Sequence, residues 1–322
     1  MAANKPVLWI TRKLSDATEA RAARDYDVQL NPEDRVFTPD EIVARSTEVD
    51  AILPCHSEHF SADVAARLSP RVKIIANHSV GVDHCDLNAL KAKGVVVTNT
   101  PDVLSDATAE IALLLMLAAA RRAGEGDRLV RAGQWTSWSP SFMVGTQMTG
   151  KRLGIVGMGR VGRAFARLIQ GFGMEIHYYN RSRLAPELEN GAIYHATVED
   201  LLPHSQFVSL HCPATPETMN LMNRERLSLL PDGAILVNTA RGALVDEAAL
   251  IEALQSGKLA AAGLDVFQVE PGGNPALARL ENVFMLPHIG SATRETRDAM
   301  GFRALDNLDA YFAGKEPRDR LV

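Results

Sequence analysis

KRLGIVGMGRVGRAFARLIQGFGMEIHYYNRSR, residues 151–183, predicts a strand, a glycine turn, a helix and a second strand in succession. The apolar run that ends at Val156 has no polar alternation, which is typical of a parallel strand buried on both faces. The glycines that follow match the pattern G-x-G-x-x-G, in which they allow a tight turn, close approach of a pyrophosphate, and packing of helix on strand. The stretch therefore predicts a dinucleotide site with its phosphates at a helix N-terminus. The residues of this turn are Gly157, Met158, Gly159, Arg160, Val161 and Gly162.

The residues after the second strand indicate which dinucleotide binds. NAD sites place Asp or Glu about 20 residues past the glycines, where the carboxylate accepts from the ribose 2′-OH. Here the position is Asn180, followed by Arg181, Ser182 and Arg183. Two guanidiniums and a hydroxyl suit a 2′-phosphate, which a carboxylate would repel. The turn therefore predicts NADPH in preference to NADH, and the alternative is a solvated surface turn.

The composition is that of a globular protein long enough for two domains, with 322 residues of which 46% are hydrophobic and 23% charged. A formal net charge of −5 gives no reason to expect nucleic acid or an anionic membrane as a partner. Cys55, Cys85 and Cys212 lack metal-ligand spacing, so we expect reduced thiols, no metal site and a cytoplasmic protein. The N-terminal apolar run is too short for a signal peptide, and the run Ile111 to Ala120 is too short to span a bilayer.

The first hundred residues alternate between predicted strands and helices, which indicates a parallel sheet covered by helices on both faces. Strands are expected at Val7 to Thr11, Val28 to Leu30, Ala51 to Pro54, Lys73 to Ala76 and Val95 to Asn99, and helices at Asp16 to Arg24, Pro39 to Ser46, Ser61 to Leu68 and Asp86 to Lys93. The loop Asn77 to Asp83 follows a strand, where open α/β sheets place ligands, and Gly81 in it allows backbone N–H groups to face a carboxylate. A simple strand-to-helix turn explains the loop equally well.

After Pro101, where the first domain is expected to end, the segment Ala107 to Arg122 is rich in Ala, Leu and Met. It predicts a helix that is apolar all round and buried between domains or against another subunit. The connector GQWTSWSP contains Trp135 and Trp138, and tryptophans in such segments often anchor interfaces. Further strands are expected at Ala192 to Tyr194, Phe207 to Cys212, Ala234 to Asn238, Ala261 to Val266 and Val283 to Leu286, and a last helix at Thr293 to Phe312.

These elements predict an α/β fold of two Rossmann-like, doubly wound parallel-sheet domains, the first of them discontinuous. We expect residues 1–101 and 289–322 to form a substrate-binding domain. Residues 102–288 should form the dinucleotide-binding domain, which includes the apolar helix and the connector.

Three polar side chains near the later strand ends suit the reduction of a small 2-oxo acid. This reaction needs a fork-shaped cation for the carboxylate, a proton donor for the carbonyl oxygen, and an anion that keeps the donor protonated. Arg241, His288 and Glu270 fit these roles in that order. Taken singly, each has a simpler interpretation, as a helix-edge charge, a loop histidine and a surface acid.

Six segments resemble, in order and over nearly the whole chain, those of the D-isomer-specific 2-hydroxyacid dehydrogenase family. They are NHSVGVDHCDL, GIVGMGRVG, HCPATPET, VNTARGALVDEAAL, AAGLDVFQVEP and PHIGSATRETR. The resemblance implies that Arg241 binds the substrate carboxylate and carbonyl, that His288 is the acid/base, and that Glu270 is its partner. It also implies a dimer built on the apolar helix. Further implied contacts are Val80, Gly81 and Ser291 with the substrate, and Thr108, Cys212, Pro213, Thr218, Thr239, Ala240, Asp265 and Gly290 with the cofactor.

Within the family, the connector and the NRSR turn are most similar to glyoxylate/hydroxypyruvate reductases that use NADPH. This implies formation of glycolate or D-glycerate, with Trp138 reaching the partner subunit's active site. Formate dehydrogenases have Gln where Glu270 stands, and the longer phosphoglycerate dehydrogenases add a regulatory domain, so both are disfavoured. Two alternatives stay open: a dinucleotide-sensing co-regulator of this fold, and a dehydrogenase for a bulkier substrate, since pocket size depends on loops such as Pro54 to Glu58, which includes Cys55 and His56.

Overall fold

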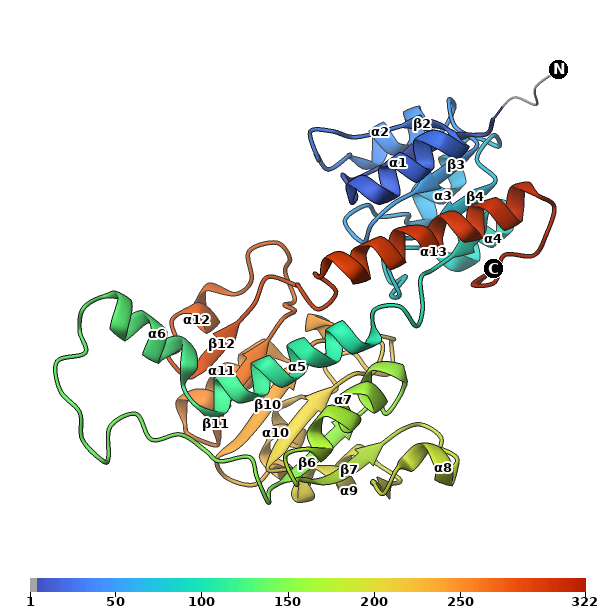
Figure 1. Cartoon of the computed structure of the whole chain (residues 1–322). Helices are drawn as coiled ribbons and strands as arrows, with labels where there is room; N and C mark the ends of the chain where they lie inside the picture. Colours follow the sequence, from blue (N-terminus) through green and yellow to red (C-terminus); the bar gives the residue numbers. More distant parts are fainter. Residues whose placement is uncertain (1–4) are drawn as a thin grey trace. The chain divides into compact units, whose positions relative to one another are not determined.

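The chain forms two compact units in a computed structural model that describes residues 5–322 (Figure 1). Residues 1–4, at the start of the segment examined for a signal peptide, lie outside the described residues. Unit 1 consists of Met1–Leu104 and Ser291–Val322, and unit 2 of Ser105–Gly290. The chain passes between the units after residues 104 and 290, where the sequence predicts residues 101 and 288.

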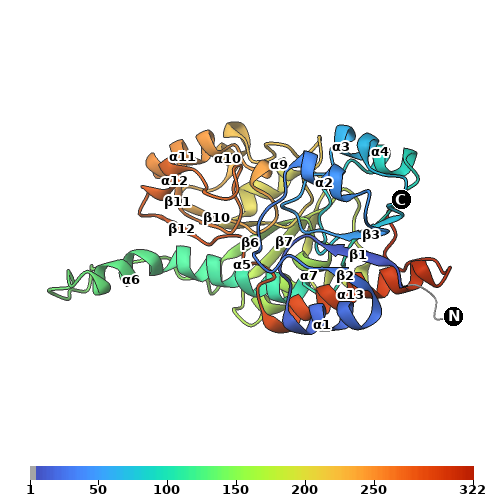
Figure 2. The same cartoon turned by 90° about the horizontal axis from the view of Figure 1, so that it is seen from above.

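Unit 1 is a five-stranded parallel sheet with helices on both faces, as predicted. The strand order is β2-β1-β3-β4-β5, with β1 at Val7–Ile10, β2 at Asp27–Gln29, β3 at Ala51–Leu53, β4 at Ile74–Ala76 and β5 at Val96–Thr98. The helices are α1 at Asp16–Asp25, α2 at Pro39–Arg45, α3 at Ala62–Arg67, α4 at Leu87–Ala92 and α13 at Arg294–Phe312. Figures 1 and 2 show α1 and α13 on one face of this sheet and α2, α3 and α4 on the other. Each face has its own apolar core, centred on Leu305 and Leu308 of α13 and on Trp9 and Ile42 respectively.

Unit 2 is a seven-stranded parallel sheet in the order β12-β11-β10-β9-β6-β7-β8. Its strands are β6 at Arg152–Val156, β7 at Glu175–Tyr179, β8 at Ile193–His195, β9 at Phe207–Leu210, β10 at Ala234–Asn238, β11 at Leu259–Leu264 and β12 at Val283–Met285. Helices α5 at Ser105–Ala120 and α7 at Arg160–Gln170 pack on one face. The other face is covered by α9 at Val198–Leu201, α10 at Arg224–Leu229 and α11 at Glu247–Gln255, while α6 at Ala123–Arg131, α8 at Pro186–Glu189 and α12 at Pro275–Ala278 complete the unit.

The carboxyl ends of the strands in unit 2 are in register. Val156 of β6 pairs with Tyr179 of β7 on one side and with Leu210 of β9 on the other. Asn238 of β10 continues the row, since it pairs with Leu210 and with Leu264 of β11. All the loops that follow these residues therefore emerge along one edge of the sheet, which is where open α/β sheets bind ligands.

The apolar helix differs from its prediction in length. It is predicted to continue to Arg122, but it ends at Ala120; Leu114 is 46% exposed in the single chain, and burial against another subunit stays a prediction. Its buried side packs within unit 2, against α7, β10 and β11. A further helix, α6, follows without any buried residue, and its two glycines, poor helix formers, hide it in the sequence. Figures 1 and 2 show α6 and the loop after it projecting from the rest of unit 2.

The helices of the described residues include none that is both long and apolar enough to cross a membrane. The cysteines Cys55, Cys85 and Cys212 are free thiols.

Candidate active site

The glycine turn after β6 has the geometry that its sequence predicts. Gly157 adopts a φ of +98°, and a Cβ there would lie 2.5 Å from the backbone nitrogen of Cys212. A Cβ on Gly162 would collide with the carbonyl oxygen of Gly157, so this glycine lets α7 approach the strand. Gly159 has open space around its Cβ position and caps α7 without a side chain. The N–H groups at the start of α7 can therefore face a phosphate directly.

Asn180, which follows β7, holds the glycine turn in place through a side-chain hydrogen bond. Its side-chain Oδ1 accepts a hydrogen bond of 2.6 Å from the backbone N–H of Met158. The residue that replaces the expected carboxylate thus helps to hold the phosphate-facing loop, and it leaves no negative charge where a 2′-phosphate would lie.

The two arginines of the NRSR turn have different surroundings, which the sequence does not predict. Arg183 makes two hydrogen bonds with the carboxylate of Glu189, at 2.7 and 3.1 Å, so part of its fork is already occupied. Arg181, Ser182 and Arg183 are all exposed, so the two arginines differ in this ion pair and not in their exposure. The binding of a 2′-phosphate by this turn stays a prediction, and the ion pair with Glu189 distinguishes Arg183 from Arg181.

His288 and Glu270 form the pair that the sequence predicts. Nδ1 of His288 lies 2.6 Å from Oε2 of Glu270, and the other carboxylate oxygen accepts from the backbone N–H of Phe267 at 2.7 Å. An ionised carboxylate only accepts, so Nδ1 carries the shared hydrogen. The remaining ring nitrogen, Nε2, is the one that can exchange a proton with a substrate.

Asp265 shapes the turn that carries His288. The backbone of His288 has a φ of +54°, a conformation that non-glycine residues seldom adopt. The carbonyl of Asp265 accepts from the N–H of His288 at 2.8 Å, and its carboxylate accepts from Ile289 and Gly290 at 2.8 and 2.7 Å. Burial raises the pKa of Asp265, which these N–H groups partly offset. The family resemblance implies only a cofactor contact for Asp265, because no local pattern connects it with a residue 23 positions later.

Arg241 follows β10 in a turn held by Asn238. The amide of Asn238 donates to the carbonyl of Arg241 at 2.8 Å and accepts from the N–H of Ala240 at 3.0 Å. One terminal nitrogen of Arg241 donates to the Ala240 carbonyl at 2.7 Å. Strand β10 pairs with β11, and β11 pairs with β12. Arg241, which follows β10, and His288, which follows β12, therefore lie at the same edge of the sheet, two strands apart.

The other predicted cofactor residues of unit 2 also gather at this edge. Thr108 of α5 is buried beside Gly290, and Thr218 closes the loop after β9 by donating to the carbonyl of Pro213 at 2.8 Å. Cys212 follows His211 in that loop, and Thr239 and Ala240 follow β10. His211 lies behind them, with Nε2 2.8 Å from the hydroxyl of Ser209, and burial lowers its pKa to about 3.

Val80, Gly81 and Ser291 belong to unit 1, and their contacts with a substrate stay predictions. In the loop after β4, Asn99 donates to the carbonyl of Val80 at 2.9 Å and Ser79 donates to that of Gly81 at 2.8 Å. These bonds fix the peptide planes of the loop. Its first turn is also tied to the loop after β3, because the N–H of His78 donates to the Pro54 carbonyl at 2.8 Å.

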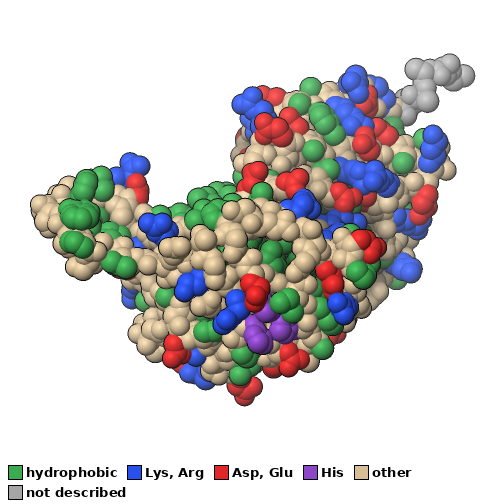
Figure 3. All heavy atoms as spheres, turned by 60° about the horizontal axis from the view of Figure 1, so that its bottom comes forward, with side chains coloured by type: hydrophobic (Ala, Val, Ile, Leu, Met, Phe, Trp, Pro, Cys, Tyr) green, Lys and Arg blue, Asp and Glu red, His purple; other side chains and the backbone are tan. Residues whose placement is uncertain are grey.

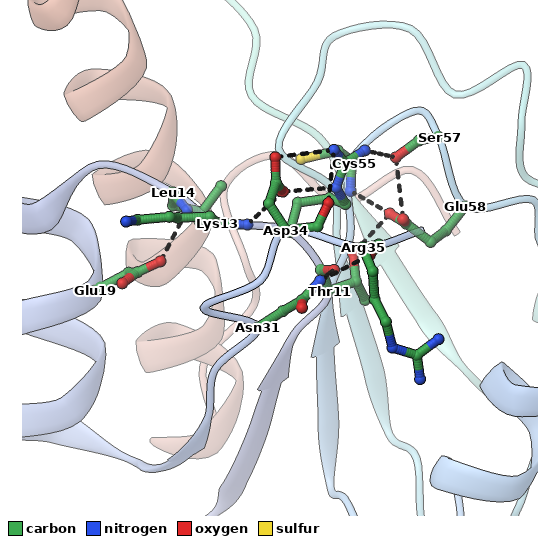
Figure 4. Close-up of polar contacts among 11 residues, drawn as sticks. Thr11, Lys13, Leu14, Glu19, Asn31, Asp34, Arg35, Cys55, Ser57 and Glu58 are labelled. Carbon is green, nitrogen blue, oxygen red and sulfur yellow. Dashed lines mark hydrogen bonds and ion pairs between the residues drawn. The ribbon is translucent and has the colours of Figure 1, made fainter. Parts of the chain in front are cut away.

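The loop after β3 is held by a buried carboxylate, which Figure 4 shows with its partners. Glu58 is fully buried, and it accepts from the hydroxyl of Thr11 at 2.7 Å and from the N–H of Cys55 at 3.2 Å. The hydroxyl of Ser57 links this carboxylate to Arg12, whose guanidinium also binds Asp34. The loop that the sequence associates with substrate size therefore has a fixed base, while His56 is exposed.

Trp135 and Trp138 lie in the projecting connector and are 56% and 73% exposed. Val130, Phe142 and Val144 nearby are also more than two-fifths exposed. Figure 3 shows hydrophobic side chains gathered on this projection. Within the described chain, these residues do not anchor a core of their own unit.

Comparisons with known proteins find relatives of this chain in sequence and in structure. Residues 113–290 match the family model described as the D-isomer specific 2-hydroxyacid dehydrogenase, NAD binding domain. The chain is 43% identical over 315 residues to a glycerate dehydrogenase of Hyphomicrobium methylovorum, covering 97% of this chain and 98% of the relative. It is 43% identical over 318 residues to a glyoxylate reductase of Pyrococcus furiosus, covering 97% and 94%.

A solved structure with a similar fold is that of an NADPH-dependent glyoxylate/hydroxypyruvate reductase from Sinorhizobium meliloti in complex with NADP and malonate. It has a TM-score of 0.88 and 31% sequence identity, and the match covers 99% of this chain and 97% of that chain. The family model spans more than half of the chain, and the curated relatives match nearly all of it. This chain belongs to the D-isomer-specific 2-hydroxyacid dehydrogenase family, and it is an oxidoreductase with two Rossmann-like domains.

Proposed function

We propose that the protein reduces a small 2-oxo acid, glyoxylate or hydroxypyruvate, to glycolate or D-glycerate with NADPH. The observation that carries the proposal is the His288–Glu270 pair, 2.6 Å apart, at the sheet edge where the glycine turn also lies. The names of the relatives support this substrate class, since a glycerate dehydrogenase and a glyoxylate reductase each match almost the whole chain.

The proposed roles follow from the positions of the side chains. A nicotinamide cofactor held at the glycine turn would supply a hydride for the carbonyl carbon. Arg241 binds the carboxylate and the carbonyl oxygen of the substrate, so that negative charge growing on that oxygen meets a fixed cation. His288 then donates its Nε2 proton to the oxygen, while Glu270 accepts from Nδ1 and fixes the orientation of the ring.

The glycine turn and the start of α7 suit the pyrophosphate of the cofactor. Gly159 leaves space there, and Asn180 holds the N–H of Met158 in place. Two observations support NADPH over NADH: there is no carboxylate at Asn180, and Arg181 and Ser182 are exposed beside it. The Sinorhizobium meliloti relative, which was solved with NADP, is consistent with this choice.

We further propose a homodimer in which α5, α6 and the connector contact a second copy of the chain. The exposed Leu114 of α5 and the exposed tryptophans of the projection support this, because such a concentration of apolar surface usually marks an interface. In this arrangement Trp138 reaches the active site of the partner subunit. A cytoplasmic location is proposed on the basis of the three free thiols.

A panel of 2-oxo acids assayed with both cofactors tests the proposal. We expect the highest kcat/KM with glyoxylate or hydroxypyruvate and NADPH. Preference for a branched or aromatic 2-oxo acid would favour the alternative of a dehydrogenase for bulkier substrates. Tight binding of NADPH without turnover of any substrate would favour a dinucleotide-sensing co-regulator.

A further inference from the structure

The turn that follows β7 contains two arginines, and the buried Glu189 distinguishes them. Nε of Arg183 donates to Oε1 of Glu189 at 2.7 Å and Nη2 donates to Oε2 at 3.1 Å, a bidentate pair. Tyr178 donates to the same carboxylate at 2.6 Å, and its hydroxyl accepts from the N–H of Leu184 at 3.1 Å. These hydrogen bonds connect the end of β7 to α8 across the turn.

Glu189 cannot easily release Arg183. Its side chain is only 10% exposed, and Tyr178 is fully buried. The hydrogen bonds from Arg183 and Tyr178 lower the pKa of Glu189 to about 2. Removing the guanidinium would leave an uncompensated carboxylate in a largely buried position, which is strongly unfavourable.

The two guanidiniums also have different neighbours. The guanidinium of Arg183 lies 5.7 Å from the ring centre of Tyr194 in β8, the strand that pairs with β7 on the side away from β6. Arg181 lies near Glu217 in the loop after β9, on the other side of β6. The pKa of Glu217 is lowered by a hydrogen bond from Thr215 and, to a smaller extent, by the charge of Arg181.

We propose that, of the two arginines in this turn, Arg181 alone binds the 2′-phosphate. Arg183 is a positioning residue held by Glu189 and Tyr178. The inference rests on the proposed use of NADPH and adds which residue selects it. Arg183 contributes the conformation of the turn, while its charge is neutralised by Glu189. Arg181 contributes the charge that distinguishes NADPH from NADH.

Single substitutions of the arginines test this division. The dissociation constants of NADPH and NADH are measured by calorimetry, which does not require turnover. Arg181→Ala should weaken NADPH by about 10-fold to 100-fold, the usual worth of a charged hydrogen bond, and NADH by less than about twofold. Arg183→Ala should lower the thermal midpoint and weaken both cofactors by similar factors, so that their ratio stays within about threefold.

Replacement of Glu189 tests the charge of Arg183 separately from the fold of the turn. A purely structural role of Glu189 predicts no change in the ratio of NADPH affinity to NADH affinity. Glu189→Gln keeps the shape but frees the charge of Arg183, so binding of NADPH should improve relative to NADH by about threefold to tenfold. The double variant Glu189→Gln with Arg183→Ala should lose this gain. Glu187→Gln, an exposed acid of the same helix, is the matched control and should leave the ratio unchanged.

The outcomes separate this inference from the proposed function. A selective loss of NADPH in Arg183→Ala as large as that in Arg181→Ala would overturn the division of roles and leave NADPH use intact. An unchanged ratio in Glu189→Gln would also overturn it. If neither arginine variant alters the ratio, the turn does not read the phosphate at all, and the proposed cofactor preference fails together with the inference.

Discussion

His288 occupies a left-handed backbone conformation, and the hydrogen bonds around it explain how the chain maintains this. A non-glycine residue in this region costs about 1–2 kcal/mol. Asp265 offsets this cost through its carbonyl and both carboxylate oxygens, which accept from three consecutive N–H groups. The strain therefore serves to aim the imidazole, which Glu270 orients from the other side.

Replacement of His288 should separate proton donation from cofactor binding. His288→Asn should reduce kcat by about 10² to 10⁴, the usual worth of general acid catalysis. Asparagine also tolerates the left-handed conformation, so the turn should persist. Affinity for NADPH should change little, because the phosphates are expected at the glycine turn. Steady-state kinetics and calorimetry check the two parts, and a near-normal kcat would mean that another group supplies the proton.

Buried histidines should make stability depend on pH below neutrality. Burial lowers the pKa of His211 to about 3 and that of His78 to about 4. It also lowers the pKa of His195, which packs against the imidazoles of His177 and His204. The unfolded chain binds these protons near pH 6.5, whereas the folded chain does not. Their stabilisation is thus complete above about pH 6.5 and declines as the pH falls toward 4.

Thermal unfolding between pH 7.5 and 4.5 measures this effect. Each such group costs up to about 1.4 kcal/mol per pH unit below 6.5. His211→Gln should therefore show a shallower fall of the midpoint than the unmodified protein, whereas exposed His59→Gln should keep the original slope. A midpoint independent of pH over this range would contradict the argument.

At the scale of elements, the glycine turn between β6 and α7 meets two separate requirements. Gly162 is needed for packing, since a Cβ there collides with the carbonyl of Gly157. Gly159 is not needed for packing, because nothing lies within 4 Å of its Cβ position. The space at Gly159 is explained by the ligand rather than by the fold.

The two glycines should accordingly respond differently to alanine. Gly162→Ala should lower the thermal midpoint, because the clash is with rigid backbone and α7 must move. Gly159→Ala should keep the midpoint and weaken both NADPH and NADH, because the methyl group occupies the space expected for the pyrophosphate. Differential scanning fluorimetry and calorimetry distinguish the cases. Full cofactor affinity in folded Gly159→Ala would place the phosphates elsewhere.

For the whole molecule, the exposed apolar surface of α5 and of the projection predicts self-association. We expect a dimer in sedimentation experiments at micromolar concentration, with Trp138 shielded from collisional quenchers. Leu114→Glu should shift the protein toward monomers, because it puts a charge on the exposed side of α5. Leu229→Glu, on the 39% exposed Leu229 of α10, is the control and should remain dimeric. A monomer at all practical concentrations would remove the basis for a role of Trp138 in a partner's site.

The sequence by itself determined the features that depend on local chemistry. A buried strand, a turn that only glycine fits and an amphipathic helix have patterns within a few residues, so a strand ending at Val156, the turn and a following helix were predicted, and β6 does end at Val156. The alternation of strands and helices likewise predicted two parallel sheets. Because parallel strands end at a common edge, it also predicted that Arg241, Glu270 and His288 would follow strand ends there.

Only the tertiary structure decided which side chains pair across the sequence. The carboxylate of Asp265 holds the turn of His288, and the buried Glu189 binds Arg183 rather than leaving it for a ligand. Likewise, α5 packs one side on α7, β10 and β11 of its own unit, whereas its composition predicted burial without indicating against which element. Such pairings depend on strand order and burial, and an acid such as Glu189 has no local pattern that distinguishes it from the exposed Glu187 two residues earlier.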